Sequence, residues 1–429
     1  MGAALAALSG TSSIALLRNT ASAQTPRRGG TMVVTGHQEI SSLSPDDASP
    51  TVHWSAVTQI HNALLELDEN FNLVPTLAQS YTASPDGTSY TFKLVKGVKF
   101  HDGTEFTADD VKYTYEWYLN PENHAIMAND FEGVDSVQAL DKYTVRVRMK
   151  QPNAAFLARG ASTFIVPAAY HSKVGEKAYK AAPIGTGAFR LKEWKPAEHT
   201  LVQAFDQHFR GRPNLDFFRV DIVPEASVRA IGLQTGNSDS AVWPLLVEDN
   251  VRLAKDPNFT TYVTVTTGVN HFPINNKRPV FADKRVRQAM LHAINRQRLI
   301  DDVFKGTAVI AVSHLSPAFK AYYEPNVATY PHDPAKAKAL LDEAGWKAGP
   351  DGVRQKGGLR LSFTCTTITG DQARRPEAEV AQQDLKAVGI EMKLAEAPVA
   401  TITEKMRKGE MDASLFNWTY GGSLGDPDP

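Results

Sequence analysis

Residues 86–111 read DGTSYTFKLVKGVKFHDGTEFTADDV, and this stretch joins a strand pattern to a helix start. Apolar and polar residues alternate from Tyr90 to Leu94, which is typical of a strand with one buried face. Thr107 and Asp110 have the spacing of a capping box, so a helix is predicted to begin at this point. A strand that is followed so closely by a capped helix favours a mixed α/β fold.

The same two patterns recur along the rest of the chain. Strict alternation predicts further strands over 143–149, 359–365 and 390–394. Helical spacing of apolar residues, with caps, predicts helices over 283–306, 334–344 and 376–389. For the first of these we expect one continuous helix with a basic outer side that ends at Gly306. No repeat of fixed period is visible, which excludes solenoids and propellers.

Length and composition exclude several classes of protein. A chain of 429 residues suggests two to four domains. The apolar fraction of 42% and the charged fraction of 22% are those of soluble globular proteins, and they exclude a disordered chain, a collagen and a coiled coil. The formal net charge of -1 lacks the basic excess of a nucleic-acid-binding protein. No apolar run reaches the roughly 18 residues that a membrane-spanning helix needs.

Motifs for catalysis, cofactors and metals are missing from the sequence. There is no G-x-G-x-x-G, no P-loop, no G-x-S-x-G and no H-E-x-x-H. The single cysteine, Cys365, excludes an internal disulfide, and its place on the apolar face of a strand indicates a core residue. We therefore expect no enzyme, no cofactor and no metal site.

Several aromatic and amide side chains are candidates for ligand contact. Aromatic residues in or beside loop-like sequence either line a cleft or cover the core; they are Trp54, Trp243, Trp418 and Tyr420. His271 and Asn275 lie in a polar stretch over 268–276, where buried polar groups need partners. Those partners are either backbone groups or a ligand, and the sequence leaves both readings open.

Both ends of the chain differ from its middle. Residues 1–23 are small and apolar and end in Ala21-Ser22-Ala23, which predicts a signal peptide with an incomplete positively charged region. The alternative is a disordered Ala/Ser-rich tail. No cysteine follows the cleavage pattern, so we expect no lipid anchor. At the other end, the turn-like Gly425–Pro429 directly follows a strand pattern, which indicates a truncated domain.

Six segments together resemble a known family. They are 62–78 (NALLEL to PTLA), 86–104 (DGT to GVKFHDGT), 107–111 (TADDV), 185–189 (GTGAF), 283–306 (DKRVRQA) and 334–346 (ending EAGW). In this order they resemble the extracytoplasmic solute-binding proteins of ABC importers, in the dipeptide/oligopeptide-binding family (bacterial solute-binding protein family 5). The resemblance covers about residues 30 to 429.

The resemblance implies a two-lobed α/β periplasmic-binding-protein fold of class II type with an inserted extra domain. Residues 30–44 and 183–255 would form the discontinuous first lobe, 45–182 the inserted domain and 256–429 the second lobe. A C-terminal segment that returns to the first lobe in this family is missing here, which is consistent with truncation.

The resemblance also implies a ligand-binding strand. In peptide-binding members, the strand that matches Asn417-Trp418-Thr419 pairs with the ligand backbone, and an Asp three residues after the Trp meets the peptide amine. That position is Gly421 here, and Asp426 comes only later. A peptide held by that anchor is therefore not expected, and opines, modified amino acids, sugars and metal complexes remain alternatives. The predicted cleft residues are Trp54, Trp243, His271, Asn275, Asn417, Trp418, Thr419 and Tyr420.

The function implied is capture of a peptide-like or other small solute by hinge closure between the lobes, followed by delivery to ABC permease subunits in the inner membrane. We expect an exported, soluble, periplasmic monomer that binds no nucleic acid. A secreted peptidase or hydrolase would need a nucleophile or metal cluster, and neither is visible. A periplasmic peptide-binding chaperone is the third alternative.

Overall fold

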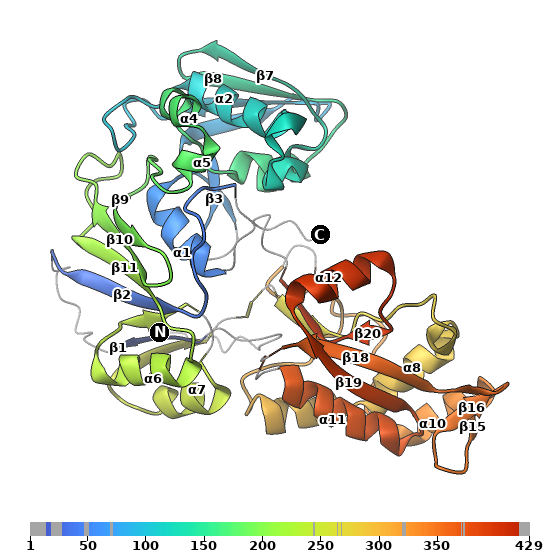
Figure 1. Ribbon diagram of the computed structural model, residues 1–429. Helices are drawn as coiled ribbons and strands as arrows, with labels where there is room; N and C mark the ends of the chain where they lie inside the picture. The colour runs from blue at the N-terminus through green and yellow to red at the C-terminus, as the bar shows by residue number, and fades with distance from the viewer. Residues whose placement is uncertain are drawn as a thin grey trace. The chain divides into compact units, whose positions relative to one another are not determined.

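The computed structural model describes residues 14–18, 28–46, 51–68, 72–242, 245–263, 265–266, 268–319, 323–369, 371 and 374–419. The chain divides into two compact units (Figure 1). The N-terminal unit contains Ile14–Leu245 and Arg252–Tyr262, and the C-terminal unit contains Leu246–Val251 and Val263–Thr419. In the described part of the chain, every helix is too short or too polar to cross a bilayer.

The N-terminal unit is built on a mixed five-stranded sheet and an antiparallel four-stranded sheet. Its strands are β1 (Ile14–Arg18), β2 (Thr31–Gly36), β3 (Leu65–Leu67), β4 (Leu73–Pro75), β5 (Ala78–Ala83), β6 (Ser89–Leu94), β7 (Val134–Asp141), β8 (Thr144–Met149), β9 (Phe189–Lys195), β10 (His199–Ala204), β11 (Phe217–Ile222), β12 (Ser240–Ala241) and β13 (Phe259–Val263). Its helices are α1 (Thr51–Ile60), α2 (Ala108–Leu119), α3 (Ala155–Ala158), α4 (Ala168–Val174), α5 (Glu176–Tyr179), α6 (Ala226–Thr235) and α7 (Val247–Ala254), the last of which extends into the other unit.

One sheet joins the beginning of the chain to a segment almost two hundred residues later. Its strand order is β12-β2-β11-β10-β9, and β2 pairs in parallel with both β11 and β12. The second sheet has the order β5-β6-β8-β7, with antiparallel neighbours throughout. Two small pairings, β3 with β4 and β1 with β13, complete the set.

Residues 86–111 contribute to the core that packs on the second sheet. β6 buries alternate residues, as predicted, and α2 begins after Thr107. The Thr107 backbone N–H donates to the Asp110 carboxylate at 2.8 Å, which is the carboxylate half of the predicted capping box. Phe100 and Phe106, on either side of the HDGT turn, are buried in the same cluster. The local pattern therefore becomes one packed unit of strand, turn and helix.

His101 connects this stretch to the Gly185-Thr186-Gly187 turn. Its backbone N–H donates to the Gly185 carbonyl at 3.0 Å, and its Nδ1 accepts from the Gly185 N–H at 3.2 Å. Because Nδ1 accepts, Nε2 carries the proton and donates to the Gly187 carbonyl at 3.0 Å. Burial lowers the pKa of His101 to about 4, which keeps this neutral tautomer.

Both glycines of the turn are required by close contact with α1. A Cβ at Gly185 would lie 2.1 Å from the Ile60 carbonyl oxygen, and one at Gly187 would lie 2.3 Å from that of Gln59. Backbone cannot give way as a flexible side chain can. Two of the segments that carry the family resemblance therefore meet at one buried histidine.

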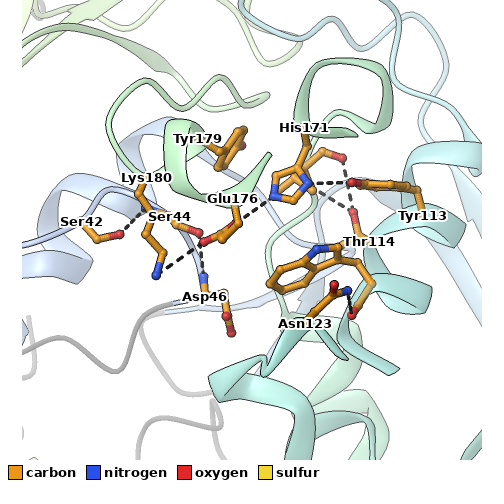
Figure 2. A network of polar contacts seen from close by, with 12 residues as sticks. Ser42, Ser44, Asp46, Tyr113, Thr114, Asn123, His171, Glu176, Tyr179 and Lys180 are labelled. Carbon is orange, nitrogen blue, oxygen red and sulfur yellow. Dashed lines mark hydrogen bonds and ion pairs between the residues drawn. The ribbon is translucent and has the colours of Figure 1, made fainter. Parts of the chain in front are cut away.

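A second buried polar network holds the small helices of this unit (Figure 2). His171 lies at its centre, with Nε2 2.8 Å from the Glu176 carboxylate and Nδ1 2.7 Å from the Tyr113 hydroxyl. Since a carboxylate only accepts, Nε2 carries a proton. Asp46, whose pKa burial raises, accepts from the Met127 N–H at 3.1 Å. The contacts of His171 join α2, α4 and α5.

The C-terminal unit places helices against a short parallel sheet. Its strands are β14 (Gly268–His271), β15 (Lys347–Ala348), β16 (Arg354–Lys356), β17 (Leu359–Arg360), β18 (Ser362–Ile368), β19 (Glu391–Ala397), β20 (Ala413–Ser414) and β21 (Phe416–Thr419). Its helices are α8 (Lys284–Ala293), α9 (Arg296–Arg298), a π-helical turn (Leu299–Val303), α10 (Pro334–Glu343), α11 (Arg374–Ala387) and α12 (Val399–Lys408).

β18 lies between β19 and β20 and is parallel to both. Its alternate residues, Phe363 and Cys365 among them, are buried with α8, α10 and α11. Burial raises the pKa of the Cys365 thiol to about 12, so this cysteine is the core residue that the sequence indicated. α10 and α11 match their predicted positions to within two residues.

The prediction of one continuous helix from Asp283 to Gly306 is wrong. α8 ends at Ala293, and Ile294 takes an extended conformation with ψ near 120°. The Asn295 side chain then caps a new helical turn by accepting from the Arg298 N–H at 3.0 Å. The helical spacing of apolar residues continues through this break, because α8 and the turn after it bury their apolar sides in the same core. Spacing alone therefore does not reveal the second cap.

Candidate functional site

Polar and charged residues of the C-terminal unit gather at the carboxyl end of its parallel sheet. β18 ends at Ile368, and α11 begins six residues later at Arg374, so the N-terminus of this helix lies at that edge. The chain beyond the carboxyl end of β20 continues directly into β21. In open α/β sheets, ligands bind outside the carboxyl ends of the strands. This edge is therefore the first place in the unit to look for a site.

An ion pair orders the connection between β18 and α11. The Asp371 carboxylate accepts from the backbone N–H of Arg374 at 2.9 Å and also pairs with its guanidinium. Both side chains are mostly buried, with exposed fractions of 15% and 13%. A second carboxylate, Glu377, follows one helical turn later and is only 4% exposed. Two carboxylates therefore lie near one guanidinium in a poorly solvated place.

A chain of side-chain hydrogen bonds leads from Glu377 to β21. Its Oε1 accepts from Asn270 Nδ2 at 2.8 Å. The Oδ1 of Asn270 in turn accepts from Asn417 Nδ2 at 2.7 Å. Asn270 and Asn417 are direct cross-strand partners in the antiparallel pair of β14 and β21. The two-stranded ladder is thus connected through side chains to the first turns of α11.

Burial sets the protonation of this carboxyl group. Removal from water raises the pKa of Glu377 to about 8, and the charge of Asp371 acts in the same direction. Arg374 and the Asn270 hydrogen bond oppose the shift. The result is a carboxyl group at the candidate site that changes charge near physiological pH, which is common at functional sites.

The structure brings four of the predicted residues together on this ladder. Asn417, Trp418 and Thr419 lie on β21, opposite Asn270, Val269 and Gly268 respectively. His271, the last residue of β14, lies opposite Phe416, and its Nδ1 is 3.2 Å from the Val269 carbonyl oxygen. These four residues stay candidates for ligand contact.

Asn275 lies apart from them, at the other end of β20. Its side chain donates to the carbonyl oxygens of Gly409 and Met411 at 3.0 and 3.1 Å, and it accepts from the Lys277 N–H. The polar side chain of Asn275 is therefore satisfied by backbone groups, which was one of the two possibilities that the sequence left open; the other was a ligand. A hollow of about 420 Å³ lies beside it, lined by residues 273–277, 406–409 and 411–414.

The remaining candidates are in the N-terminal unit or outside the described residues. Trp54, on α1, packs against Phe164 with ring centroids 6.0 Å apart and has His53 edge-on at 5.2 Å. It is half-buried over a small apolar cluster that contains Val57. Trp243 and Tyr420 lie outside the described residues, as do Gly421 and Asp426.

Sequence reasoning did not single out Asn270, Asp371, Arg374 or Glu377. A signal was present for Glu377, because it falls on the buried stripe of α11 with Ala381 and Leu385 at intervals of four residues. A charged residue on an apolar stripe needs a partner. The sequence does not show that this partner is Asn270, more than one hundred residues away.

Comparisons with known proteins agree with this architecture. A family profile described as "Bacterial extracellular solute-binding proteins, family 5 Middle" matches residues 72–429. The oligopeptide-binding protein AppA of Bacillus subtilis is 32% identical over 413 residues, which span 93% of this chain and 75% of that protein. The glutathione-binding protein GsiB of Salmonella typhimurium is 31% identical over 407 residues, which span 92% of this chain and 76% of that protein.

Solved structures give the same result. AppA from Bacillus subtilis, in complex with a nonapeptide, has a TM-score of 0.80 at 30% identity and covers 94% of this chain and 81% of its own. NikZ from Campylobacter jejuni, in complex with Ni(L-His), has a TM-score of 0.81 at 26% identity. The match covers 93% of this chain and 78% of the NikZ chain. These likenesses confirm the predicted periplasmic-binding-protein fold. The chain belongs to the bacterial extracellular solute-binding proteins of family 5.

Proposed function

We propose that this protein is the substrate-binding component of an ABC importer, and that it captures a peptide-like or other small solute. The observation that carries this proposal is the polar edge of the C-terminal unit, where Asn417 on β21 is joined through Asn270 to Glu377. This edge is where open α/β sheets bind ligands. AppA and GsiB, which bind an oligopeptide and glutathione by name, support a peptide-like ligand.

The mechanism is closure of two lobes about a hinge. A ligand that contacts both lobes binds the closed form better than the open form, and this difference in affinity is what shifts the equilibrium. We assign 30–44 and 183–255 to the first lobe, 45–182 to the inserted domain and 256–429 to the second lobe. The first assignment is supported by the pairing of β2 with β11 and β12 in one sheet.

The partners and the compartment follow from the same proposal. The closed, loaded protein would dock on permease subunits in the inner membrane, and a separate ATPase would supply the energy. Residues 1–23 would direct export to the periplasm, where the protein works as a monomer. It would bind its solute reversibly and make or break no covalent bond.

A thermal-shift panel tests the proposed function. The probes are penta-alanine, glutathione and nickel with L-histidine, each up to millimolar concentration. A ligand at one hundred times its Kd stabilises the folded state by about 2.7 kcal/mol, which raises Tm by several degrees. We expect penta-alanine or glutathione to do so. Hydrolysis of penta-alanine without a saturable shift from any of the three probes would contradict the proposal and favour a hydrolase.

The site assignment has its own test. Because Trp418 follows Asn417 on the ligand strand, we expect Trp418→Ala to weaken binding of the probe by about tenfold or more, with little change in Tm of the free protein. Isothermal titration calorimetry measures the affinity. Tyr262→Ala, which removes an exposed aromatic side chain of the N-terminal unit, is the matched control. Unchanged affinity in the Trp418 variant would remove β21 from the site.

A further inference from the structure

The outer face of the four-stranded sheet in the N-terminal unit carries two arginines on one strand. On β8, Val145 and Val147 are buried in the core. Side chains alternate along a strand, so Arg146 and Arg148 lie together on the opposite face. Arg146 is half-buried and Arg148 is exposed. Within the part of the chain that the structure describes, neither guanidinium forms an ion pair or a hydrogen bond.

The cross-strand neighbours of both arginines are uncharged. Each arginine of β8 has one such neighbour on β6 and one on β7, and these are Thr91 and Gln138 for Arg146, and Ser89 and Ser136 for Arg148. A carboxylate directly opposite an arginine is the usual way for a sheet face to balance its charge. At these four positions that balance is missing.

The carboxylates at the ends of this face have other partners. Asp86, in the turn between β5 and β6, accepts from the Ser84 hydroxyl and from the Thr88 N–H at 3.1 Å. Asp141, at the end of β7, interacts with the charge of Lys93. The two guanidinium groups start from backbone positions about 7 Å apart on one strand, so their like charges repel each other. A bound anion would relieve this repulsion.

A hollow of about 270 Å³ opens on the sheet beside these arginines. Both guanidinium-bearing residues line it, together with hydroxyl side chains of β5 and β6. Ser84 is one of them, and its hydroxyl already donates to Asp86 and accepts from the Ser89 N–H. The hydroxyls of Thr82, Ser89 and Thr91 make no hydrogen bond to any described residue, and a hydroxyl can rotate to donate. The hollow therefore presents two cations and three available donors.

We propose that this hollow binds a phosphate group that carries two negative charges, either free phosphate or the phosphate of a monoester. The planar fork of an arginine matches two phosphate oxygens in charge-assisted hydrogen bonds. Two guanidinium groups balance a dianion, and the remaining oxygens can accept from the hydroxyls. A carboxylate, with one charge and two oxygens, would leave one arginine unbalanced.

This inference goes beyond capture of the transported solute. The hollow lies in residues 45–182, which we assign to the inserted domain, whereas the candidate solute site lies on β14, β21 and α11 of the C-terminal unit. A soluble phosphate monoester and a lipid headgroup with a terminal phosphate present the same chemistry to the two arginines. The experiments below distinguish these two sources.

The first experiment observes the two arginines directly. The full chain, labelled with ¹⁵N-arginine, is titrated with inorganic phosphate at pH 8, where phosphate is mainly a dianion, against sodium chloride of equal ionic strength. The arginine Nε–H signals are assigned with Arg146→Lys and Arg148→Lys. We expect both signals to shift together with one saturating Kd, and acetate to bind at least about tenfold more weakly. The signal of Arg360, which is paired with Asp351, should stay in place. Arg146 and Arg148 signals that do not saturate with phosphate overturn the site for free phosphate.

The second experiment tests whether the arginines carry the binding. Phosphate should raise Tm of the wild type more than sodium chloride of equal ionic strength does. We expect the double variant Arg146→Gln/Arg148→Gln to bind phosphate at least about tenfold more weakly, because it loses the charge-assisted hydrogen bonds, and to lose the extra rise in Tm. Arg219→Gln/Arg360→Gln, which removes the same charge from two ion-paired arginines, should keep both. If the first double variant does not fold, Arg148→Gln alone should still weaken binding by about threefold or more. Equal binding by wild type and the Arg148 variants would overturn the proposal.

The third experiment identifies the source of the phosphate. The probes are glycerol 3-phosphate and phosphatidylcholine vesicles that contain phosphatidic acid, with binding to vesicles measured by sedimentation. Saturable binding of glycerol 3-phosphate that the double variant loses assigns the site to a soluble monoester. Binding to the vesicles alone, lost in the same variant, assigns it to a lipid headgroup. No saturable binding of phosphate, glycerol 3-phosphate or vesicles overturns the proposal. Failure of penta-alanine to bind would count against the proposed function only, because these probes do not depend on it.

Discussion

His101 in the N-terminal unit and Glu377 in the C-terminal unit are both buried titratable groups that join segments far apart in the chain, yet they differ in what they join. His101 bonds only to backbone, through Gly185 and Gly187. Glu377 bonds to a side-chain amide that leads to another. Backbone partners cannot flip, and carboxamides can. The first arrangement therefore fixes two backbone segments against each other, and the second links side chains across the candidate site.

The two groups also differ in the sign of their pKa shift. Burial lowers the pKa of His101 to about 4 and raises that of Glu377 to about 8, because each group is held in its neutral form. The same physical cause therefore makes one unit sensitive to acid and the other to alkali. Substitutions at or beside either group test this difference.

The largest effect is expected at the His101 contact. Gly187→Ala would place a Cβ 2.3 Å from the Gln59 carbonyl oxygen, so the turn must move and the hydrogen bonds to His101 are lost. We expect a loss of more than about 3 kcal/mol in the free energy of unfolding, or no folded protein. Urea denaturation followed by circular dichroism measures the loss.

Gly232→Ala is the matched control for this substitution. Gly232 lies inside α6, and its Cβ would meet only the Ser238 Oγ at 3.0 Å, a side chain that can rotate. Alanine gains up to about 1 kcal/mol of helix propensity over glycine, so the effect should be small or stabilising. Equal losses in the two variants would show that the backbone contact at Gly187 is not what matters.

The next effect is expected at Glu377. Because its pKa rises from 4.5 in the unfolded chain to about 8, its contribution to stability is present below pH 4.5 and is lost as pH rises through 8. At about 1.4 kcal/mol per pKa unit, the change is roughly 3 to 5 kcal/mol. We expect Glu377→Gln to be more stable than wild type at pH 9 and to show a flatter profile between pH 5 and 9. Urea titrations across this range measure it.

Glu379→Gln on the same helix should keep the wild-type pH profile, because Glu379 is exposed and pairs with Arg375 at the surface. A Glu377→Gln profile as steep as that of wild type would mean that the buried carboxyl group titrates normally. The contrast between the two units would then disappear.

The smallest effect is expected in acid. The stability that His101 contributes is present above pH 6.5 and is lost as pH falls through 4, since its pKa is lowered on folding. Its shift of about 2.5 pKa units amounts to roughly 3 kcal/mol. We expect His101→Gln, although less stable at pH 7, to lose less further stability between pH 6.5 and 4. The exposed His332→Gln serves as control. An unchanged acid slope in the His101 variant would assign acid sensitivity to other groups, such as His61, whose pKa burial lowers to about 3.

Local patterns predicted most elements of both units. The capping-box spacing of Thr107 and Asp110 and the Pro334 start of α10 need only neighbours within one turn, so the sequence contains the whole signal. The break at Ile294 was missed for the opposite reason: a second cap at Asn295 restarts the helix without interrupting the apolar spacing. The part of the site that lies on one strand, Asn417 to Thr419, was likewise accessible from a family pattern.

Buried strands, capped helices and a mixed α/β fold could be predicted from the amino-acid sequence, because their signals repeat at intervals of two to four residues. Which polar residues meet depends on contacts between distant segments of the folded chain. Asn270, Glu377 and Asn417 are separated by up to 147 positions, and the contact of His101 with Gly185 spans 84. The burial that shifts the pKa of Glu377 depends on the folded surroundings, so no local pattern contains it.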